Sequence, residues 1–174
     1  MCDELPGDVA EREFESYVAA RWRPLLRAAW LLTGNWAAAE DLVQSALAGV
    51  WAHWSRVQSV AEPDAYVRRM LTNEFLGQQR RRSSTELPTE IMPVSSTPDA
   101  TVDVNRRLAL TRALDELPPQ QRAAVVLRYF EDLSLEQTAA ALGCSVGTAK
   151  SQTSRALTKL RGSVHIDTLL QEQN

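Results

Sequence analysis

The sequence has few of the residues that build metal, disulfide or catalytic sites. Its 174 residues include two cysteines, Cys2 and Cys144, and two histidines, His53 and His165, each pair far apart along the chain. This spacing matches neither a disulfide framework nor the ligand set of a zinc site. Glycine-rich phosphate-binding loops and the H-E-x-x-H pattern of metalloproteases are also absent from the sequence. We therefore expect no metal, no cofactor and no enzymatic activity.

Long apolar segments are also missing. The richest stretch, residues 28–39, is interrupted by Thr33, Gly34 and Asn35, whereas a membrane helix needs about 18 consecutive apolar residues. The N-terminus is acidic and lacks the basic-then-apolar order of a secretory signal. With 44% hydrophobic and 24% charged residues, the composition is typical of a folded globular protein. We expect a cytoplasmic protein without membrane insertion.

Charge is distributed unevenly along the chain. The net charge is −3, but residues 10–82 carry ten basic and eight acidic side chains, and residues 105–162 carry nine basic and five acidic ones. Residues 83–104 between them carry four acidic side chains and no basic one. Because potentials act within about 8–10 Å at physiological salt, two basic blocks can attract nucleic acid even in an acidic chain.

Residues 83–104 have the composition of a linker. They contain three prolines, no aromatic residue and no helical period, a pattern typical of a linker. Fully extended, these 22 residues span at most about 75 Å. We predict a domain over residues 10–82, a flexible acidic linker over 83–104, a second domain over 105–162 and a short tail over 163–174.

Apolar side chains in both blocks recur every three or four residues, as in amphipathic helices. In the first block, Gly34 ends one helix, Asn35 caps the next and Pro63 begins a third, with a loop over residues 55–62. No segment has the alternation of a strand. The predicted fold class is all-α: two small helical domains joined by a flexible linker.

The second block predicts a helix-turn-helix. Pro119 begins one helix, Ser134 and Gln137 form a capping-box signal for a short helix, and Ser145 caps a last helix that ends near Arg161. Two short helices joined by a tight turn, the second rich in basic residues, are typical of this DNA-binding motif.

The last helix separates apolar from polar residues. The side expected to pack on the preceding helices consists of Val146, Ala149, Ala156, Leu157 and Leu160. The opposite face brings together Lys150, Ser151, Ser154 and Arg155, and residues 145–162 contain no acidic residue. Such a face suits the DNA major groove, where Lys and Arg reach guanine edges or phosphates. A solvated basic helix in a small bundle fits the same pattern, so the wheel alone leaves both interpretations open.

Longer motifs resemble the extracytoplasmic-function sigma factors of bacterial RNA polymerase. The segments LPPQQR (117–122), VLRYFEDLS (126–134) and GTAKS (147–151) resemble the promoter-binding C-terminal domain of that family. The segment AEDLVQ (39–44) resembles its polymerase-docking helix, and DAYVRRMLTN (64–73) resembles its −10 segment. The actinobacterial SigE-like subgroup is the nearest. The resemblance covers about residues 12–162, with both domains in the family order.

The resemblance implies a non-enzymatic subunit that reads two promoter elements. One partner would be core RNA polymerase, through the clamp helices of its largest subunit, and the other would be promoter DNA. Polymerase-binding residues would be Glu40, Asp41, Val43, Gln44 and Leu47. Residues at the −10 element would be Arg68, Arg69, Asn73, Arg80, Arg81 and Arg82. Residues at the −35 element would be Arg128, Ser145, Thr148, Lys150, Ser151, Ser154, Arg155 and Lys159.

Two other functions compete with this interpretation. A stand-alone helix-turn-helix regulator would bind operators without polymerase, but the sequence offers no evident dimerisation helix for a palindromic site. An enzyme with a DNA-binding appendage has no constellation of reactive residues to support it. An anti-sigma factor is a common partner in the family, and this sequence does not identify one.

Overall fold

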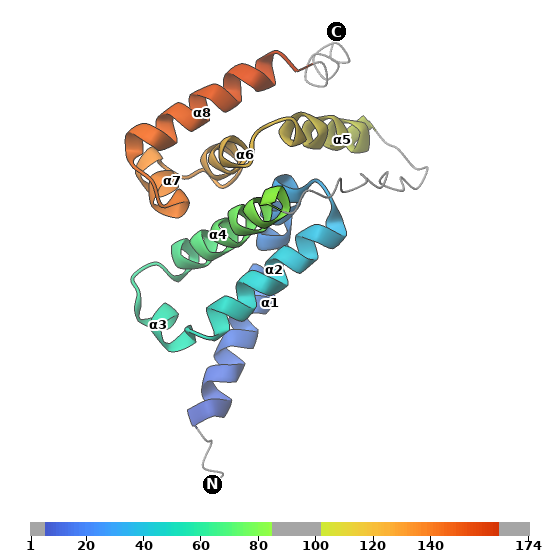
Figure 1. Cartoon of the computed structure of the whole chain (residues 1–174). Coiled ribbons are helices and arrows are strands. Elements are labelled where there is room, and N and C mark those ends of the chain that lie inside the picture. The colour runs from blue at the N-terminus through green and yellow to red at the C-terminus, as the bar shows by residue number, and fades with distance from the viewer. Residues whose placement is uncertain (1–5, 85–101, 164–174) are drawn as a thin grey trace.

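The fold is helical throughout the part of the chain that the structure describes. The structure is a computed structural model that describes residues 6–84 and 102–163. No strand occurs within those two ranges, and helices account for nearly all of their residues (Figure 1). The all-α prediction is confirmed.

Four helices build the N-terminal domain: α1 (Pro6–Thr33), α2 (Trp36–Trp51), α3 (Trp54–Ser59) and α4 (Pro63–Ser84). The turn between α1 and α2 forms as predicted. Gly34 has φ +70°, a conformation that glycine adopts without steric penalty. Asn35 caps α2, because its side-chain oxygen accepts the N–H of Ala38 at 3.0 Å.

The short helix α3 corrects the sequence-based prediction of a loop over residues 55–62. Trp54 and Val57 are both buried, and they lie three residues apart on one face of α3. The Trp54 ring packs against the rings of Phe14 and Tyr17, at centroid distances of 5.1 and 5.4 Å. Two anchoring residues are too few to give a periodic signal, so the helix depends on these tertiary contacts.

The C-terminal domain contains α5 (Val102–Asp115), α6 (Pro119–Val125), the π-helical turn η1 (Val126–Phe130), α7 (Leu135–Leu142) and α8 (Val146–Arg161). The predicted caps are confirmed. Ser134 and Gln137 form a reciprocal capping box at α7, Gly143 ends α7 with φ +65°, and Ser145 caps α8. The helix-turn-helix of α7 and α8 therefore follows from local sequence signals.

Both helices that border the predicted linker extend into it. α4 continues to Ser84 and α5 begins at Val102, whereas the sequence predicted a linker over residues 83–104. The rest of the predicted linker, and the predicted tail beyond Ser163, lie outside the described residues.

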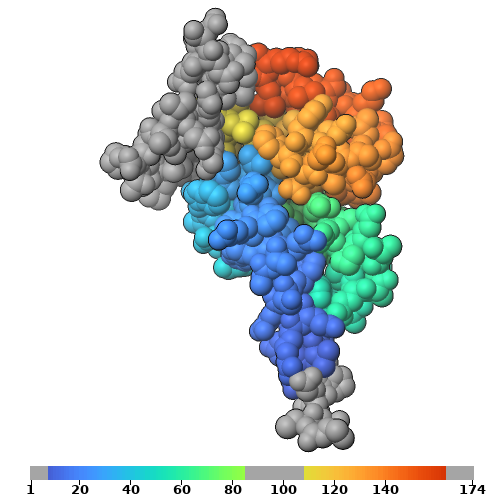
Figure 2. Space-filling view, turned by 180° about the vertical axis from the view of Figure 1, so that it is seen from behind, coloured from blue at the N-terminus to red at the C-terminus, as the bar shows by residue number. Residues whose placement is uncertain are grey.

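The two domains pack directly on each other (Figures 1 and 2). α7 lies against α4, and α6 and the end of α5 lie near the turn that follows α1. α8 packs on α6 and α7 and lies on the far side of the C-terminal domain from α4 (Figure 1). The arrangement brings residues of the two blocks together and leaves one face of α8 in solvent.

Candidate nucleic-acid interface

α8 buries one side and exposes the other. Ala149 and Ala156 are fully buried, as the wheel predicts, whereas Lys150, Ser154 and Arg155 are exposed. Because the exposed residues recur at helical spacing, they form one continuous face with a basic character.

The burial of two residues of α8 differs from the prediction of the helical wheel. Val146 is 42% exposed because it stands in the first turn, beyond the helices on which α8 packs. Thr153 is buried, and its hydroxyl donates to the carbonyl of Ala149 at 2.8 Å. This internal bond satisfies the hydroxyl and lets a polar residue occupy the packed side.

The predicted residues at the start of α8 mainly fix the helix terminus. Ser145 accepts the N–H of Thr148 at 3.1 Å, and the two hydroxyls lie 2.9 Å apart. The Ser151 hydroxyl donates to the Thr148 carbonyl at 3.0 Å. Ser145 and Thr148 are exposed and Ser151 is half-buried, so all three border the solvent face while serving local hydrogen bonds.

A basic cleft of about 340 Å³ runs beside α8. Arg128, which is half-buried, donates to the Leu133 carbonyl at 2.9 Å and lies 5.6 Å from the ring centre of Tyr129. This contact positions the guanidinium at the cleft. The lining residues are Arg128, Tyr129, Leu135, Lys150, Thr153, Ser154, Leu157 and Arg161. No acidic side chain is among them, so the cleft suits an anion such as a phosphate.

Arg161 and Tyr129 were missed by the sequence analysis. Arg161 stands 11 residues after Lys150, about three helical turns, and therefore lies on the same edge of α8. A helical wheel extended by one more turn would have placed Arg161 on this edge. Tyr129 is 53% exposed on η1, and no pattern in the sequence singled it out. Arg155 and Lys159 are exposed farther round the helix, away from the cleft.

The basic residues predicted on α4 divide between two sides. Arg69, Asn73 and Arg80 are exposed, and their spacings of four and seven residues stack them on one face. Arg68 instead faces the C-terminal domain, where its Nε lies 3.1 Å from Glu131 Oε2. The structure therefore groups three of the predicted residues and separates Arg68 from them.

The two remaining arginines lie near the end of α4. Arg81 pairs with Glu74 on the same helix at 3.0 Å. Arg82 and Arg80 are exposed and border an open cleft of about 470 Å³ that also includes Pro119 of α6. This end of α4 remains strongly basic.

The residues predicted to bind polymerase also fall into two groups, one exposed and one buried. Glu40, Asp41 and Gln44 are exposed on α2, but Val43 and Leu47 are 0% and 6% exposed. These two apolar residues belong to the core of the N-terminal domain, because they face α1 and α4. This burial corrects the sequence-based set, which placed them on the contact surface.

Trp51 is an exposed aromatic residue on the same side of α2. It is 44% exposed and stands seven residues, or two turns, after Gln44. Its ring packs against Phe14 at a centroid distance of 5.0 Å, which holds it in place. An exposed, positioned tryptophan beside a polar stripe is typical of a protein-binding surface.

Two further observations concern the described residues alone. None of their helices is long and apolar enough to cross a membrane. Within the same ranges, no group of three or more His, Cys, Asp or Glu side chains could hold a metal ion.

Family comparisons match both halves of the chain. Residues 18–85 match the family described as Sigma-70 region 2, and residues 107–160 match Sigma-70, region 4. Both are regions of sigma factors, and they occur here in sequence order.

Proteins named as sigma factors are similar to this chain along most of their length. The chain is 44% identical over 149 residues to the RNA polymerase sigma-E factor of Streptomyces coelicolor, covering 86% of this chain and 84% of the relative. It is 31% identical over 153 residues to the ECF RNA polymerase sigma factor SigL of Mycobacterium tuberculosis, covering 85% and 84%. This chain therefore belongs to the extracytoplasmic-function sigma factors.

A solved structure resembles both domains. The sigma factor RpoE of Bartonella quintana, crystallised in complex with the anti-sigma factor NepR, matches with a TM-score of 0.70 and 29% identity. The match covers 87% of this chain and 96% of that one.

Proposed function

We propose that this chain binds core RNA polymerase and directs it to promoters by reading the −35 element with α8 and the −10 element with α4. The observation that carries the proposal is the order of the two sigma-70 regions, combined with an exposed basic face on α8. The protein acts in the cytoplasm and catalyses no reaction of its own. Polymerase supplies the chemistry, and this chain supplies promoter choice.

At the −35 element, α8 enters the major groove. Lys150, Ser151 and Arg155 read base edges, and Arg128 and Lys159 contact phosphates. The basic cleft adds Arg161 to the phosphate contacts, because it lies on the same edge as Lys150. Direct readout by Lys or Arg discriminates bases by about 1–3 kcal/mol for each good contact.

At the −10 element, α4 contributes the exposed face of Arg69, Asn73 and Arg80 to strand opening. Extruding a base from the duplex costs a few kcal/mol. Cationic and amide side chains that contact the separated strand offset part of this cost. Arg68 can contact the separated strand only after its ion pair with Glu131 breaks.

Polymerase binding uses the exposed side of α2. Glu40, Asp41 and Gln44 supply polar contacts to the clamp helices, and Trp51 supplies an apolar anchor at the end of the stripe. By analogy with the solved RpoE–NepR complex, we also propose that an anti-sigma protein binds this chain.

The test is reconstitution with core polymerase on a genomic DNA library. We expect the holoenzyme to select and transcribe a small set of promoters that core polymerase alone ignores. The Asp41→Arg variant should weaken assembly at least tenfold in a pull-down while keeping the helical circular-dichroism signal. The matched control is Glu11→Arg, an exposed residue on α1 with the same change of charge.

The alternative hypothesis of a stand-alone helix-turn-helix regulator predicts the opposite result. Sequence-specific DNA binding by the free chain, with no association to core polymerase, would replace the sigma-factor proposal with that alternative.

A further inference from the structure

Two contacts fix the guanidinium of Arg128 on η1. Its Nη1 donates to the Leu133 carbonyl at 2.9 Å, and its Cζ lies 5.6 Å from the ring centre of Tyr129. The first contact is a hydrogen bond from a charged donor, which is stronger than a neutral one. The second lies within the distance of about 6 Å over which the face of an aromatic ring attracts a cation. Arg128 is therefore held from two directions although it borders the solvent.

The contact with Leu133 depends on the turn that follows η1. Asp132 has φ +52°, a left-handed conformation that aspartate tolerates better than most other residues. The chain turns back at this residue, and the N–H of Leu133 donates to the Leu127 carbonyl at 3.1 Å. Because the Leu133 side chain is also buried, its carbonyl is a fixed acceptor for Arg128.

The contact with Tyr129 joins two neighbours in the sequence. Side chains one position apart in an α-helix point in different directions and do not face each other. Arg128 and Tyr129 nevertheless meet, on a turn that is π-helical and therefore wound more loosely than an α-helix. Such turns are frequent at functional sites.

Tyr129 is exposed, and packing in the core does not explain its ring. The side chain is 53% exposed, and its hydroxyl forms no hydrogen bond with any residue that the structure describes. Phe130, the next residue, is 44% exposed. Of these two rings, only that of Tyr129 has a cation against its face and lines the cleft beside α8.

The guanidinium is held where other cations gather. The cleft of about 340 Å³ beside α8 is lined by Arg128 and Tyr129 from η1 and by Lys150 and Arg161 from α8. None of the three cations belongs to an ion pair within the described residues. Their charges are therefore available to an anion, and phosphate oxygens are the anionic groups that DNA presents along its grooves.

An arginine that is held in place before DNA arrives binds more tightly than a mobile one. Ordering a long side chain on binding costs conformational entropy. For Arg128, this cost is met when the chain folds, because the Leu133 carbonyl and the Tyr129 ring restrain it. The guanidinium still has N–H donors besides the one that Leu133 accepts, and their planar geometry suits a phosphate.

We propose that Tyr129 is a positioning residue for promoter binding: its ring holds Arg128 at the cleft beside α8, so that the guanidinium is in place when a DNA phosphate arrives. The inference rests on the proposed function of α8 and Arg128 at the −35 element. The ring provides the effect and the hydroxyl does not, because the face of the ring attracts the cation. Loss of the ring weakens binding to all duplexes alike, since a phosphate contact carries no sequence information.

The experiment measures binding of the full chain to short DNA duplexes by fluorescence anisotropy at several salt concentrations. One duplex carries the −35 element of a promoter selected by the reconstituted holoenzyme, and the other has an unrelated sequence of the same length. We expect Arg128→Ala to flatten the slope of the logarithm of the association constant against the logarithm of salt concentration by about 0.9 on both duplexes, the value for one lost phosphate contact. An unchanged slope would overturn the proposal, because Arg128 would then contact no phosphate.

Variants of Tyr129 separate the ring from the hydroxyl. Tyr129→Leu should weaken binding to both duplexes about threefold, whereas Tyr129→Phe, which keeps the ring, should stay within about 1.5-fold of the wild type. Tyr129→Gln also lacks a ring and repeats the test without an exposed apolar side chain. Phe130→Leu makes a matched change on the exposed neighbour outside the cleft and should leave binding unchanged. Equal losses in Tyr129→Leu and Tyr129→Phe would overturn the proposal and make the hydroxyl itself a DNA contact.

A double variant shows whether Tyr129 acts through Arg128. The combination of Arg128→Ala and Tyr129→Leu should bind no more weakly than Arg128→Ala alone, because the ring then has no guanidinium to hold. A tyrosine with a merely structural role would add its full loss in the double variant, and this result would overturn the proposal. All variants should keep the helical circular-dichroism signal of the wild type.

Failure of the proposed function gives a different result. A wild-type chain that binds the −35 duplex no more tightly than the unrelated one would overturn the reading of that element by α8. The unrelated duplex would still decide whether Tyr129 holds Arg128 against a phosphate. A wild-type chain that binds neither duplex would overturn both proposals.

Discussion

α8 and α4 both carry basic residues that the sequence assigns to DNA, but their surroundings differ. α8 packs by its apolar side and leaves Lys150 and Arg155 in solvent. α4 is covered on two sides, by its own domain and by α7, and Arg68 is paired with Glu131. A basic helix can therefore bind DNA directly only where the tertiary structure leaves its charged side chains exposed and unpaired.

The largest expected effect concerns the face of α8. Arg155→Ala should lower affinity for the −35 element by about 1–3 kcal/mol and relax base preference at one position, because a base contact is lost. Lys159→Ala should weaken all −35 sequences alike and flatten the salt dependence. A panel of single-base −35 variants, measured against both proteins, separates the two roles. An unaltered preference at every position with Arg155→Ala would show that the reading face lies elsewhere on α8.

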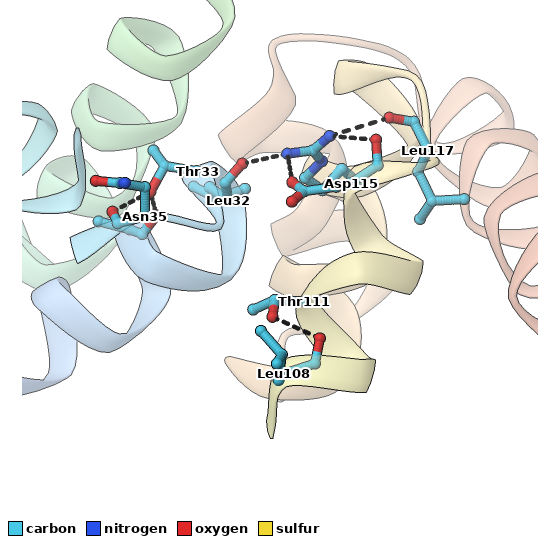
Figure 3. A network of polar contacts seen from close by, with 9 residues as sticks. Leu32, Thr33, Asn35, Leu108, Thr111, Asp115 and Leu117 are labelled. Carbon is cyan, nitrogen blue, oxygen red and sulfur yellow. Dashed lines mark hydrogen bonds and ion pairs between the residues drawn. The ribbon is translucent and has the colours of Figure 1, made fainter. Parts of the chain in front are cut away.

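The next effect concerns the contact between the turn after α1 and the end of α5 (Figure 3). Gly34→Ala should reduce the free energy of unfolding by about 1–3 kcal/mol, because φ +70° is strained for alanine and the new Cβ would meet Asp115. Gly143→Ala is the matched control, with φ +65° and no atom within 4 Å of the added carbon. Chemical denaturation of both variants measures the difference. Equal losses would mean that Asp115 moves aside freely and that Gly34 does not govern the domain contact.

A smaller effect distinguishes the two sides of α4. Asn73 is exposed and free of the interface, so Asn73→Ala should slow open-complex formation several-fold on a duplex promoter and less on a pre-melted one, where unstacking is already complete. Arg69→Ala should behave in the same way, as it shares the exposed face. Stopped-flow fluorescence on the two templates gives the rates. Equal slowing on both templates would assign Asn73 to docking or stability rather than to strand opening.

The smallest effect concerns α2. Trp51→Ala should weaken core polymerase binding by less than about 1 kcal/mol, a smaller loss than that of the charge reversal at Asp41, because the ring is already half in contact with Phe14. Ala48→Ser, an exposed neighbour, serves as the control for a neutral change on this helix. Titration of labelled core polymerase measures both. A loss no greater than that of the control would remove Trp51 from the binding surface.

Local chemistry explains the features that could be predicted from the sequence. Asn35, Ser134 and Ser145 cap their helices with bonds to residues three positions away, and Gly34 and Gly143 end helices through their own backbone freedom. These interactions span one helical turn, so their residue types are visible in a short window. The polar face of α8 follows from the same periodicity.

Features that depend on distant residues could not be predicted in this way. The burial of Val43 and Leu47 and the formation of α3 required knowing what packs against them. The sequence shows that residues 10–82 and 105–162 are two helical blocks that carry the motifs of a sigma factor. Only the tertiary structure decides that Glu131 meets Arg68 across 63 residues and Arg122 meets the Leu32 carbonyl across 90, because pairing over such separations depends on how whole helices pack and leaves no periodic trace in the chain.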